Sequence, residues 1–397
     1  MADPFTAAQL HHIAVTPAKG DAATRVLSPK DFADSWAEIT QWDGYAPTPL
    51  VPLSGLAAQI GVARINYKHE GPRFGLGSFK ALGGAYAAMR VLQRELGKRL
   101  GHTVTLADIR KGNYADACRA ITMCSATDGN HGRSLAWGCQ RVGAPCRIYI
   151  HAEVSEGRAQ AMRDLGAEVV RIDGDYDASV ALARDEAEAN GWFVVSDTSW
   201  EGYTEPPRDV MAGYGVMTHE ACATMEATPT HVFLQGGVGG LAASVAAFLR
   251  QYLGDDAPRV VITEPEWAAC LYESARKGAA TTVPIDKETI MAGLSCGEPS
   301  EMAWEILREE ATDFVTMPDS IVAPTVRLLA NAESGDAKIE AGESAVAGLA
   351  TLIAAMRQPD LAKALGLDAS SRVLLIGSEG VTDPAIFKAI MAGADHV

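Results

Sequence analysis

One lysine, Lys80, lies in an unusual setting, the stretch RFGLGSFKALG (73–83), whose other residues are mostly small or apolar. The residues that follow, ALGGAYAAM, suit tight packing better than contact with water. A lysine kept from water tends to have a lowered pKa, and its neutral amine can form a Schiff base with a carbonyl compound. The alternative is a surface lysine whose stem lies along a helix while its ammonium reaches water. The stretch by itself leaves both interpretations open.

A cluster of glycines, QGGVGG (235–240), follows the apolar run HVFL and precedes the helical pattern LAASVAAFL. Glycines at a strand-to-helix turn let the backbone wrap closely around a phosphate at a helix N-terminus. The spacing is not GxGxxG, and no GK[ST] follows, so neither a dinucleotide fingerprint nor a Walker A loop is present. Tight turns also use glycine, but this context favours a phosphate site. A Schiff-base lysine together with a phosphate loop is what pyridoxal phosphate requires.

Three further loops follow strand-like runs and carry polar groups. SATDGNHGR (125–133) has Asx residues and glycines that could bind a carboxylate, or could simply cap the next helix. SDTSWEGY (196–203) places Asp197 after WFVV, where an acid can also be a turn residue. GSEGVTDP (377–384) places a hydroxyl and a carboxylate after VLLI, although a plain polar loop would look the same.

Short β-rich runs alternate with Ala-rich helical patterns along the chain. This alternation predicts an α/β fold with βαβ units and mainly parallel sheets, and the number of strands favours two doubly wound domains. The predicted strands are 64–70, 121–126, 146–151, 168–172, 192–196, 231–235, 259–264, 313–317 and 372–377.

The best candidate for a domain break is WEGYTEPPRDVMA (200–212), where two prolines and a glycine separate a strand from a helix. We therefore expect a large domain from 1–89 and 206–397 and a smaller one from 90–205. Ligands of open α/β sheets bind beyond the carboxyl ends of the strands, so the loops described above are the expected site.

Composition narrows the class of partner. The 397 residues include 34 basic and 50 acidic ones, a net charge of −16, which argues against a nucleic-acid partner. The cysteines are scattered without a CxxC pair, so neither a zinc site nor a disulfide framework is expected, and no metal site is predicted. No signal peptide and no apolar run near the length of a membrane span is found. We expect a soluble, cytoplasmic protein with no membrane partner.

The ordered set GSFKALGGAYA, ATDGNHGR, QGGVGG and GSEG resembles the fold-type II pyridoxal-phosphate enzymes, the group of tryptophan synthase β-subunit and threonine dehydratase. Within that group the chain is most similar to the diaminopropionate ammonia-lyases. Dehydratases usually have an arginine where this chain has Leu82, and they lack the acid that Asp128 provides. The later run VVSDTSWEGYTEPP also resembles the ammonia-lyases.

The resemblance implies a cofactor, pyridoxal 5'-phosphate, in the cleft between the two domains, and it implies roles for single residues. Lys80 would form the Schiff base, Phe79 would pack beside the ring and Asn130 would bond its phenolic oxygen. Ser378 would face the pyridine nitrogen, and Thr127 would hold the substrate carboxylate. The turn implied to bind the phosphate comprises Gly236, Gly237, Val238, Gly239 and Gly240.

The implied reaction is α,β-elimination of 2,3-diaminopropionate, in both enantiomers, to pyruvate and ammonia by a homodimer. Ammonia is a poor leaving group unless protonated, so acids near Cβ are needed, and Asp128 and Asp197 are the candidates for both catalysis and substrate binding. Lys80 would act as base for the L form and Asp128 for the D form. The alternatives are a serine, threonine or hydroxyaspartate dehydratase and, in another class, a β-replacement transferase of the cysteine synthase type.

Overall fold

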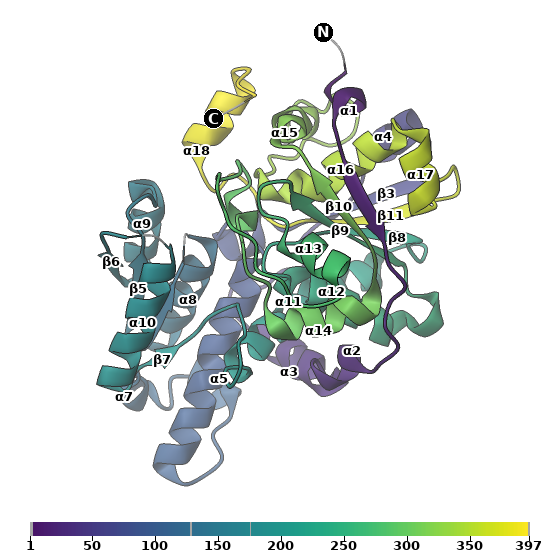
Figure 1. The fold of residues 1–397 in the computed structure, drawn as a ribbon. Coiled ribbons are helices and arrows are strands. Elements are labelled where there is room, and N and C mark those ends of the chain that lie inside the picture. Colours follow the sequence, from purple (N-terminus) through teal and green to yellow (C-terminus); the bar gives the residue numbers. More distant parts are fainter. Residues whose placement is uncertain (1–2, 128, 175, 396–397) are drawn as a thin grey trace. The chain divides into compact units, whose positions relative to one another are not determined.

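The structure, a computed structural model, describes residues 3–127, 129–174 and 176–395. Contacts within the chain divide it into two compact units. We call the first, which comprises 1–29, 47–79 and 217–397, the large unit, and the second, which comprises 30–46 and 80–216, the small unit. These units do not share their boundaries with the domains expected from sequence, and the predicted division at 89/90 and 205/206 stays a prediction. Figure 1 labels elements of each unit where there is room and colours them along the chain.

The described part of the large unit contains one sheet of seven strands in the order β1-β10-β9-β8-β11-β3-β2. The five inner strands run parallel, while β1 and β2 pair antiparallel at the two edges. The strands are β1 (His11–Ala14), β2 (Leu50–Pro52), β3 (Arg64–His69), β8 (His231–Gln235), β9 (Arg259–Pro265), β10 (Ala311–Met317) and β11 (Arg372–Gly377).

Helices cover this sheet because most residues of the inner strands are buried. Strand residues such as Phe233, Val261 and Val373 share one core with α16, whose residues are almost all buried. The helices are α1 (Pro4–Ala7), α2 (Ala22–Arg25), α4 (Ser54–Ile60), α12 (Gly240–Leu253), α13 (Cys270–Lys277), α14 (Glu301–Glu310), α15 (Val322–Ala330), α16 (Ala347–Met356), α17 (Pro359–Leu365) and α18 (Pro384–Met391), with 3₁₀ turns at Arg73–Gly75, Gly254–Asp256, Ala292–Leu294, Asp319–Ile321 and Ser344–Val346.

The small unit is built around a parallel sheet in the order β6-β5-β4-β7. Its strands are β4 (Met123–Ala126), β5 (Cys146–Ile150), β6 (Glu168–Arg171) and β7 (Phe193–Val194). Its helices are α3 (Pro29–Ile39), α5 (Lys80–Leu100), α6 (Leu106–Arg110), α7 (Ala115–Cys118), α8 (Asn130–Val142), α9 (Glu156–Arg163), α10 (Tyr176–Asn190) and α11 (Glu205–Thr224), of which α3 starts and α11 ends in the large unit.

Helix α5, which begins at Lys80, packs closely against α8 through small residues. A Cβ on Gly84 would lie 2.7 Å from the Ser134 hydroxyl oxygen, and a Cβ on Gly138 would lie 2.6 Å from the Cα of Ala85. The Ser134 hydroxyl also accepts a hydrogen bond of 3.0 Å from the Ala85 amide. The small residues after Lys80 therefore let the two helices approach, as the sequence indicated.

The predicted fold class is confirmed, and each predicted strand is found to within a few residues. The sequence did not predict β1 and β2, which are three or four residues long and half exposed at the sheet edges. Strands this short carry too few residues to show a pattern, and they form because a longer neighbour offers unpaired backbone groups.

Candidate active site

The glycine turn of the large unit joins the end of β8 to the start of α12. Gly237 and Gly239 have φ angles of +61° and +98°, which glycine adopts at little cost. The amides of Gly237 and Val238 have no acceptor among the described residues, and they precede the N-terminus of a helix of fourteen residues. Unpaired amides beside the positive end of a helix dipole form an anion site. The turn can hold a phosphate.

Glu264, at the end of the neighbouring strand β9, supports this turn from beneath. A Cβ on Gly236 would lie 2.5 Å from the Glu264 Cγ, so only glycine fits there. The Glu264 carboxyl accepts hydrogen bonds from the amides of Leu271 and Tyr272, at 3.0 and 2.7 Å, and so caps α13. Complete burial raises the pKa of Glu264 to about 8, although the hydrogen bonds that its carboxyl accepts from these two amides oppose the rise. Glu264 was not predicted as a site residue, although it ends the predicted strand RVVITE, where site residues are expected.

Ser378 follows β11, the parallel neighbour of β8, so its hydroxyl and the glycine turn lie beyond the carboxyl ends of adjacent strands. The buried Ser378 hydroxyl accepts a hydrogen bond of 3.3 Å from the Gln235 side-chain amide, which leaves its own proton available for donation. The Gln235 Oε1 is buried and has no partner among the described residues. These buried polar groups can serve a polar ligand.

The segment directly before Lys80 is hydrogen-bonded to the segment around Ser378. The Phe79 amide donates to the Ser378 carbonyl at 2.9 Å, and the Gly380 amide donates to the Gly77 carbonyl at 2.8 Å. The Phe79 side chain is buried. Lys80 is the next residue along the chain, so its backbone position depends on this pairing.

A buried cluster of charges anchors the same segment further upstream. Arg73 is 1% exposed, and its guanidinium bonds the carboxylates of both Glu70 and Glu220 at 2.7 to 2.9 Å. Lys68 bonds Glu220 at 2.5 Å, so two cations and two anions balance within the large unit. Removing one member would leave a buried charge unpaired, at a cost of about 3 to 5 kcal/mol. This cluster holds the start of the turn that leads to Lys80.

In the small unit, the Lys80 ammonium contacts the Asp197 carboxylate directly. Asp197 follows β7, which lies beside β4 in the sheet, and Lys80 is the first residue of α5. Burial alone would raise the pKa of Asp197, but the charge and hydrogen bond of Lys80, together with its other neighbours, outweigh burial and hold the pKa well below its usual range. Tyr214, from α11, is also within electrostatic reach of Lys80. The structure therefore joins two of the residues that the sequence singled out.

His131 lies against the same carboxylate. Its Nδ1 is 4.0 Å from an Asp197 oxygen, and its Nε2 is 2.8 Å from the Val195 carbonyl, to which it must donate. Burial lowers the pKa of His131, so the ring is neutral near pH 7 and its Nδ1 carries a lone pair. The side chain is 4% exposed. His131 is thus packed and hydrogen-bonded, and it lies beside Asp197.

The remaining sequence-predicted residues lie in the loop after β4. The Thr127 side chain is buried, and its hydroxyl accepts a hydrogen bond of 3.3 Å from the Gly129 amide, which shapes the loop. Asn130 is the first residue of α8 and is half-buried. Asp128 lies outside the described residues.

Comparisons with known proteins also point to a pyridoxal-phosphate enzyme. The family model for pyridoxal-phosphate dependent enzymes matches residues 41–379. The diaminopropionate ammonia-lyase of Escherichia coli K12 is 40% identical over 363 residues, 89% of each chain.

The chain belongs to the diaminopropionate ammonia-lyase family of pyridoxal-phosphate-dependent enzymes.

Solved structures of the Escherichia coli enzyme share the fold. Its complex with D-serine has a TM-score of 0.88 at 35% identity, and its complex with an aminoacrylate-PLP azomethine reaction intermediate has 0.87 at 34%. Both alignments cover 98% of each chain. The fold class and the cofactor expected from the sequence are confirmed.

The residues present fit pyridoxal phosphate. Within the large unit, the turn after β8 offers unpaired amides that could hold a phosphate, and the Ser378 hydroxyl could donate to a pyridine nitrogen. Within the small unit, Lys80 has an amine that could form a Schiff base. In the described part of the chain, no group of three or more His, Cys, Asp or Glu residues could hold a metal ion, and no helix is long and apolar enough to cross a membrane.

Proposed function

We propose that this chain eliminates ammonia from 2,3-diaminopropionate to give pyruvate and a second ammonia. The observation that carries the proposal is the contact between the Asp197 carboxylate and the Lys80 ammonium. A carboxylate that holds one ammonium in a half-buried site can hold another, and the substrate differs from serine by an amine in place of the hydroxyl. The identity with ammonia-lyases supports the same reading.

The residues would divide the work as follows. The unpaired amides of Gly237 and Val238 would hold the cofactor phosphate, and the Ser378 hydroxyl would donate to the pyridine nitrogen. The whole turn comprises Gly236, Gly237, Val238, Gly239 and Gly240. Phe79 packs beside the ring, and Asn130 bonds its phenolic oxygen. When bound, pyridoxal phosphate withdraws electrons from the substrate Cα and so makes its proton acidic. A hydroxyl beside the pyridine nitrogen allows this nitrogen to stay unprotonated. The weaker electron withdrawal of the neutral ring is enough for elimination.

Proton transfers would fall to the small unit. The Lys80 amine takes the Cα proton of the L substrate, and Asp197 keeps the β-amine protonated until its bond to Cβ breaks and it departs as ammonia. Thr127 and its loop hold the substrate carboxylate. His131 stays neutral, and its ring packs beside the Asp197 carboxylate, so that it restricts where this carboxylate can move. Hydrolysis of the remaining three-carbon enamine gives pyruvate.

We further propose that both enantiomers react, with Asp128 as the base for the D form. The proposal depends on the acid inserted into ATDGNHG, a sequence feature. Asp128→Asn should abolish turnover of the D substrate and leave turnover of the L substrate nearly intact. Persistent D activity combined with lost L activity would refute the assignment.

We also propose a cytoplasmic homodimer. Support for the location comes from the seven cysteines, none of which is in a disulfide in the described structure. The dimer is what the family resemblance implies. Light scattering of the purified holoenzyme at several concentrations measures the assembly, and a monomer at all of them would contradict it.

The decisive experiment incubates holoenzyme with each enantiomer of diaminopropionate, serine and threonine, and follows pyruvate, 2-oxobutyrate and ammonia. We expect pyruvate from diaminopropionate with two ammonia molecules per pyruvate, and much lower kcat/KM with the hydroxy amino acids. Faster turnover of serine or threonine would identify a dehydratase. A thioether amino acid formed in the presence of added thiol would identify a β-replacement transferase.

A further inference from the structure

The segment that carries Asp197 forms a turn that one tyrosine closes. The Tyr203 hydroxyl donates to the Val194 carbonyl and accepts from the Ser196 amide, both at 2.9 Å. Burial raises the pKa of Tyr203, so its proton is present at all relevant pH values. One hydroxyl therefore bonds the backbone on both sides of Val195 and reaches the residue directly before Asp197.

A stack of side chains holds this tyrosine from the other side. The Trp200 ring lies on the Tyr203 ring with centroids 4.0 Å apart and an angle of 10° between planes. The Arg184 guanidinium lies 3.7 Å above the Trp200 ring. The backbones of Trp200 and Tyr203 also pair, with the Tyr203 amide donating at 2.9 Å. The stack orients the phenol toward β7.

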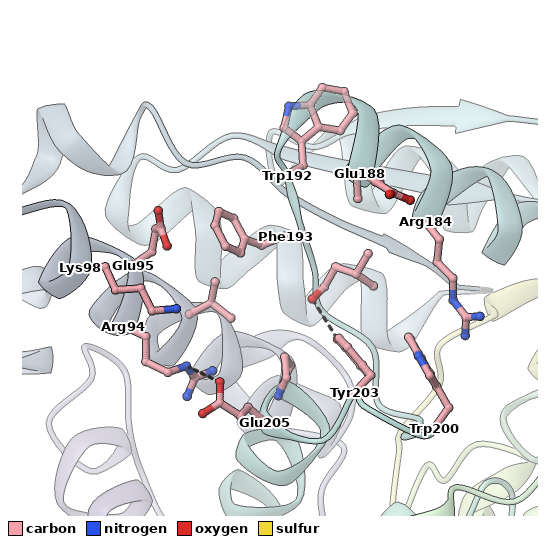
Figure 2. A pocket seen from close by; sticks show the side chains of 14 residues that line it. Arg94, Glu95, Lys98, Arg184, Glu188, Trp192, Phe193, Trp200, Tyr203 and Glu205 are labelled. Atoms are coloured by element: carbon pink, nitrogen blue, oxygen red, sulfur yellow. Dashed lines mark hydrogen bonds and ion pairs between the residues drawn. The ribbon is translucent and has the colours of Figure 1, made fainter.

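The two ends of the turn border a cavity. A cavity of about 380 Å³ opens there within the small unit, lined by Val194, Trp200 and Tyr203 among others. Figure 2 shows Tyr203, Trp200 and Arg184 along one side of this cavity and Arg94, Glu95 and Lys98 along the other. Because Val194 and Tyr203 both line this cavity, the bond between the Tyr203 hydroxyl and the Val194 carbonyl holds the two ends of the turn together at its wall.

We infer that Tyr203 is a positioning residue for Asp197 in the elimination reaction, an inference that rests on the role of Asp197 in the proposed function. Val195 is tied to Cys124 of β4 and to His131, so the strand end is fixed up to that residue. The Tyr203 hydroxyl also fixes the next residue, Ser196, because it accepts a hydrogen bond from the Ser196 amide. Asp197 then meets Lys80 from a rigid backbone rather than from a loop beside a cavity.

Tyr203→Phe tests the inference because it removes the hydroxyl and keeps the stacked ring. A misplacement of about 1 Å can lower a rate a hundredfold, so we expect kcat per bound cofactor to fall about tenfold to a hundredfold, with KM within about twofold of wild type. The matched control is Tyr149→Phe in the same unit, which removes another bonded, buried phenol hydroxyl, the partner of Glu186. This control should keep kcat within about twofold.

A second measurement needs neither substrate nor cofactor. In the apoprotein, Tyr203→Phe should speed hydrogen exchange of the Ser196 amide about tenfold or more, and Tyr149→Phe should not. Should wild type fail to act on diaminopropionate, the proposed function would be wrong, but exchange at Ser196 would still judge the positioning of the turn. Unchanged exchange in Tyr203→Phe would overturn the inference whatever the substrate.

A further variant guards against misfolding of Tyr203→Phe. Trp200→Leu keeps the hydroxyl and removes the stacked ring, and it should lower kcat about threefold. The inference is wrong if Tyr203→Phe keeps wild-type kcat. It is also wrong if Tyr149→Phe loses as much kcat, or if the lost activity only tracks lost bound cofactor or a lower Tm.

Discussion

The groups proposed to bind the cofactor in the large unit differ in kind from those proposed to move protons in the small unit. The phosphate turn uses backbone amides, which glycines expose and Glu264 supports, and few side chains take part. The small unit uses the charged side chains of Lys80 and Asp197 in direct contact. A permanent anion such as phosphate needs a fixed array of dipoles, whereas proton transfer needs groups that can change charge.

Because of this difference, the two regions should be sensitive to different kinds of substitution. The glycine turn should be sensitive to an added methyl group, because its backbone approaches neighbours too closely for a Cβ. The Lys80 region should be sensitive to a removed charge or amine, while its shape is set by the α5–α8 packing. Four substitutions test this contrast.

The largest effect is expected from Lys80→Arg, which keeps the positive charge and removes the nucleophilic amine. Activity should fall by at least about a thousandfold, because a guanidinium does not form the Schiff base. Borohydride treatment should attach the cofactor covalently to wild type and not to the variant, as read by mass spectrometry. Lys98→Arg, an exposed lysine of the same helix, is the control. Residual turnover near the control level would place the nucleophile elsewhere.

Asp197→Asn should follow, with kcat lower by roughly a hundredfold to ten-thousandfold, because the amide cannot keep the departing amine protonated. Its cofactor content should stay normal, since the phosphate turn is untouched. Asp209→Asn, a buried acid of the same unit paired with Arg90 and Arg94, should lose stability and keep most of its kcat. Equal losses of kcat in both variants would argue against a special role for Asp197.

Gly239→Ala should weaken cofactor binding by about tenfold or more, as measured by titrating apoprotein with pyridoxal phosphate. Gly239 has φ +98°, and a Cβ there would lie 3.0 Å from that of Ala303, so the turn must shift. Gly278→Ala is the matched control, because Gly278 has φ +73° but open space around it. Both variants should lose about 1 kcal/mol of stability, and only Gly239→Ala should lose affinity. Unchanged affinity would mean that the phosphate lies elsewhere.

The last prediction concerns Glu264→Gln and the dependence of stability on pH. The folded pKa of Glu264 is raised to about 8, above an unfolded value near 4.3, so the folded state binds more protons in between. The contribution of this group to stability is thus greatest below pH 4 and is lost as pH rises to about 8, at up to about 1.4 kcal/mol per unit. Chemical unfolding of apoprotein should show wild type losing stability relative to the variant across that range. Parallel pH curves would show that Glu264 is ionised in the fold.

Much of the fold was predictable because inner strands and long helices have strong patterns. The runs HVFLQ and RVLLIG match β8 and β11 residue for residue. The edge strands β1 and β2 were missed because their pairing comes from neighbours distant in sequence, Phe314 opposite Ile13 for example. Tyr203 was present in the quoted motif SDTSWEGY, but its role depends on a hydroxyl that reaches Val194 and Ser196, which no spacing shows.

Some features of this protein could be predicted from the residue types alone. Glycines at 237 and 239 permit left-handed backbone, and the small residues after Lys80 permit close helix packing, because both properties belong to the residue types. The contact of Lys80 with Asp197 joins residues 117 positions apart. It exists because β7 pairs with β4, and because α5, which begins at Lys80, packs on α8, the helix that follows β4. The pairing of distant strands is a property of the folded chain, and only the tertiary structure decided it.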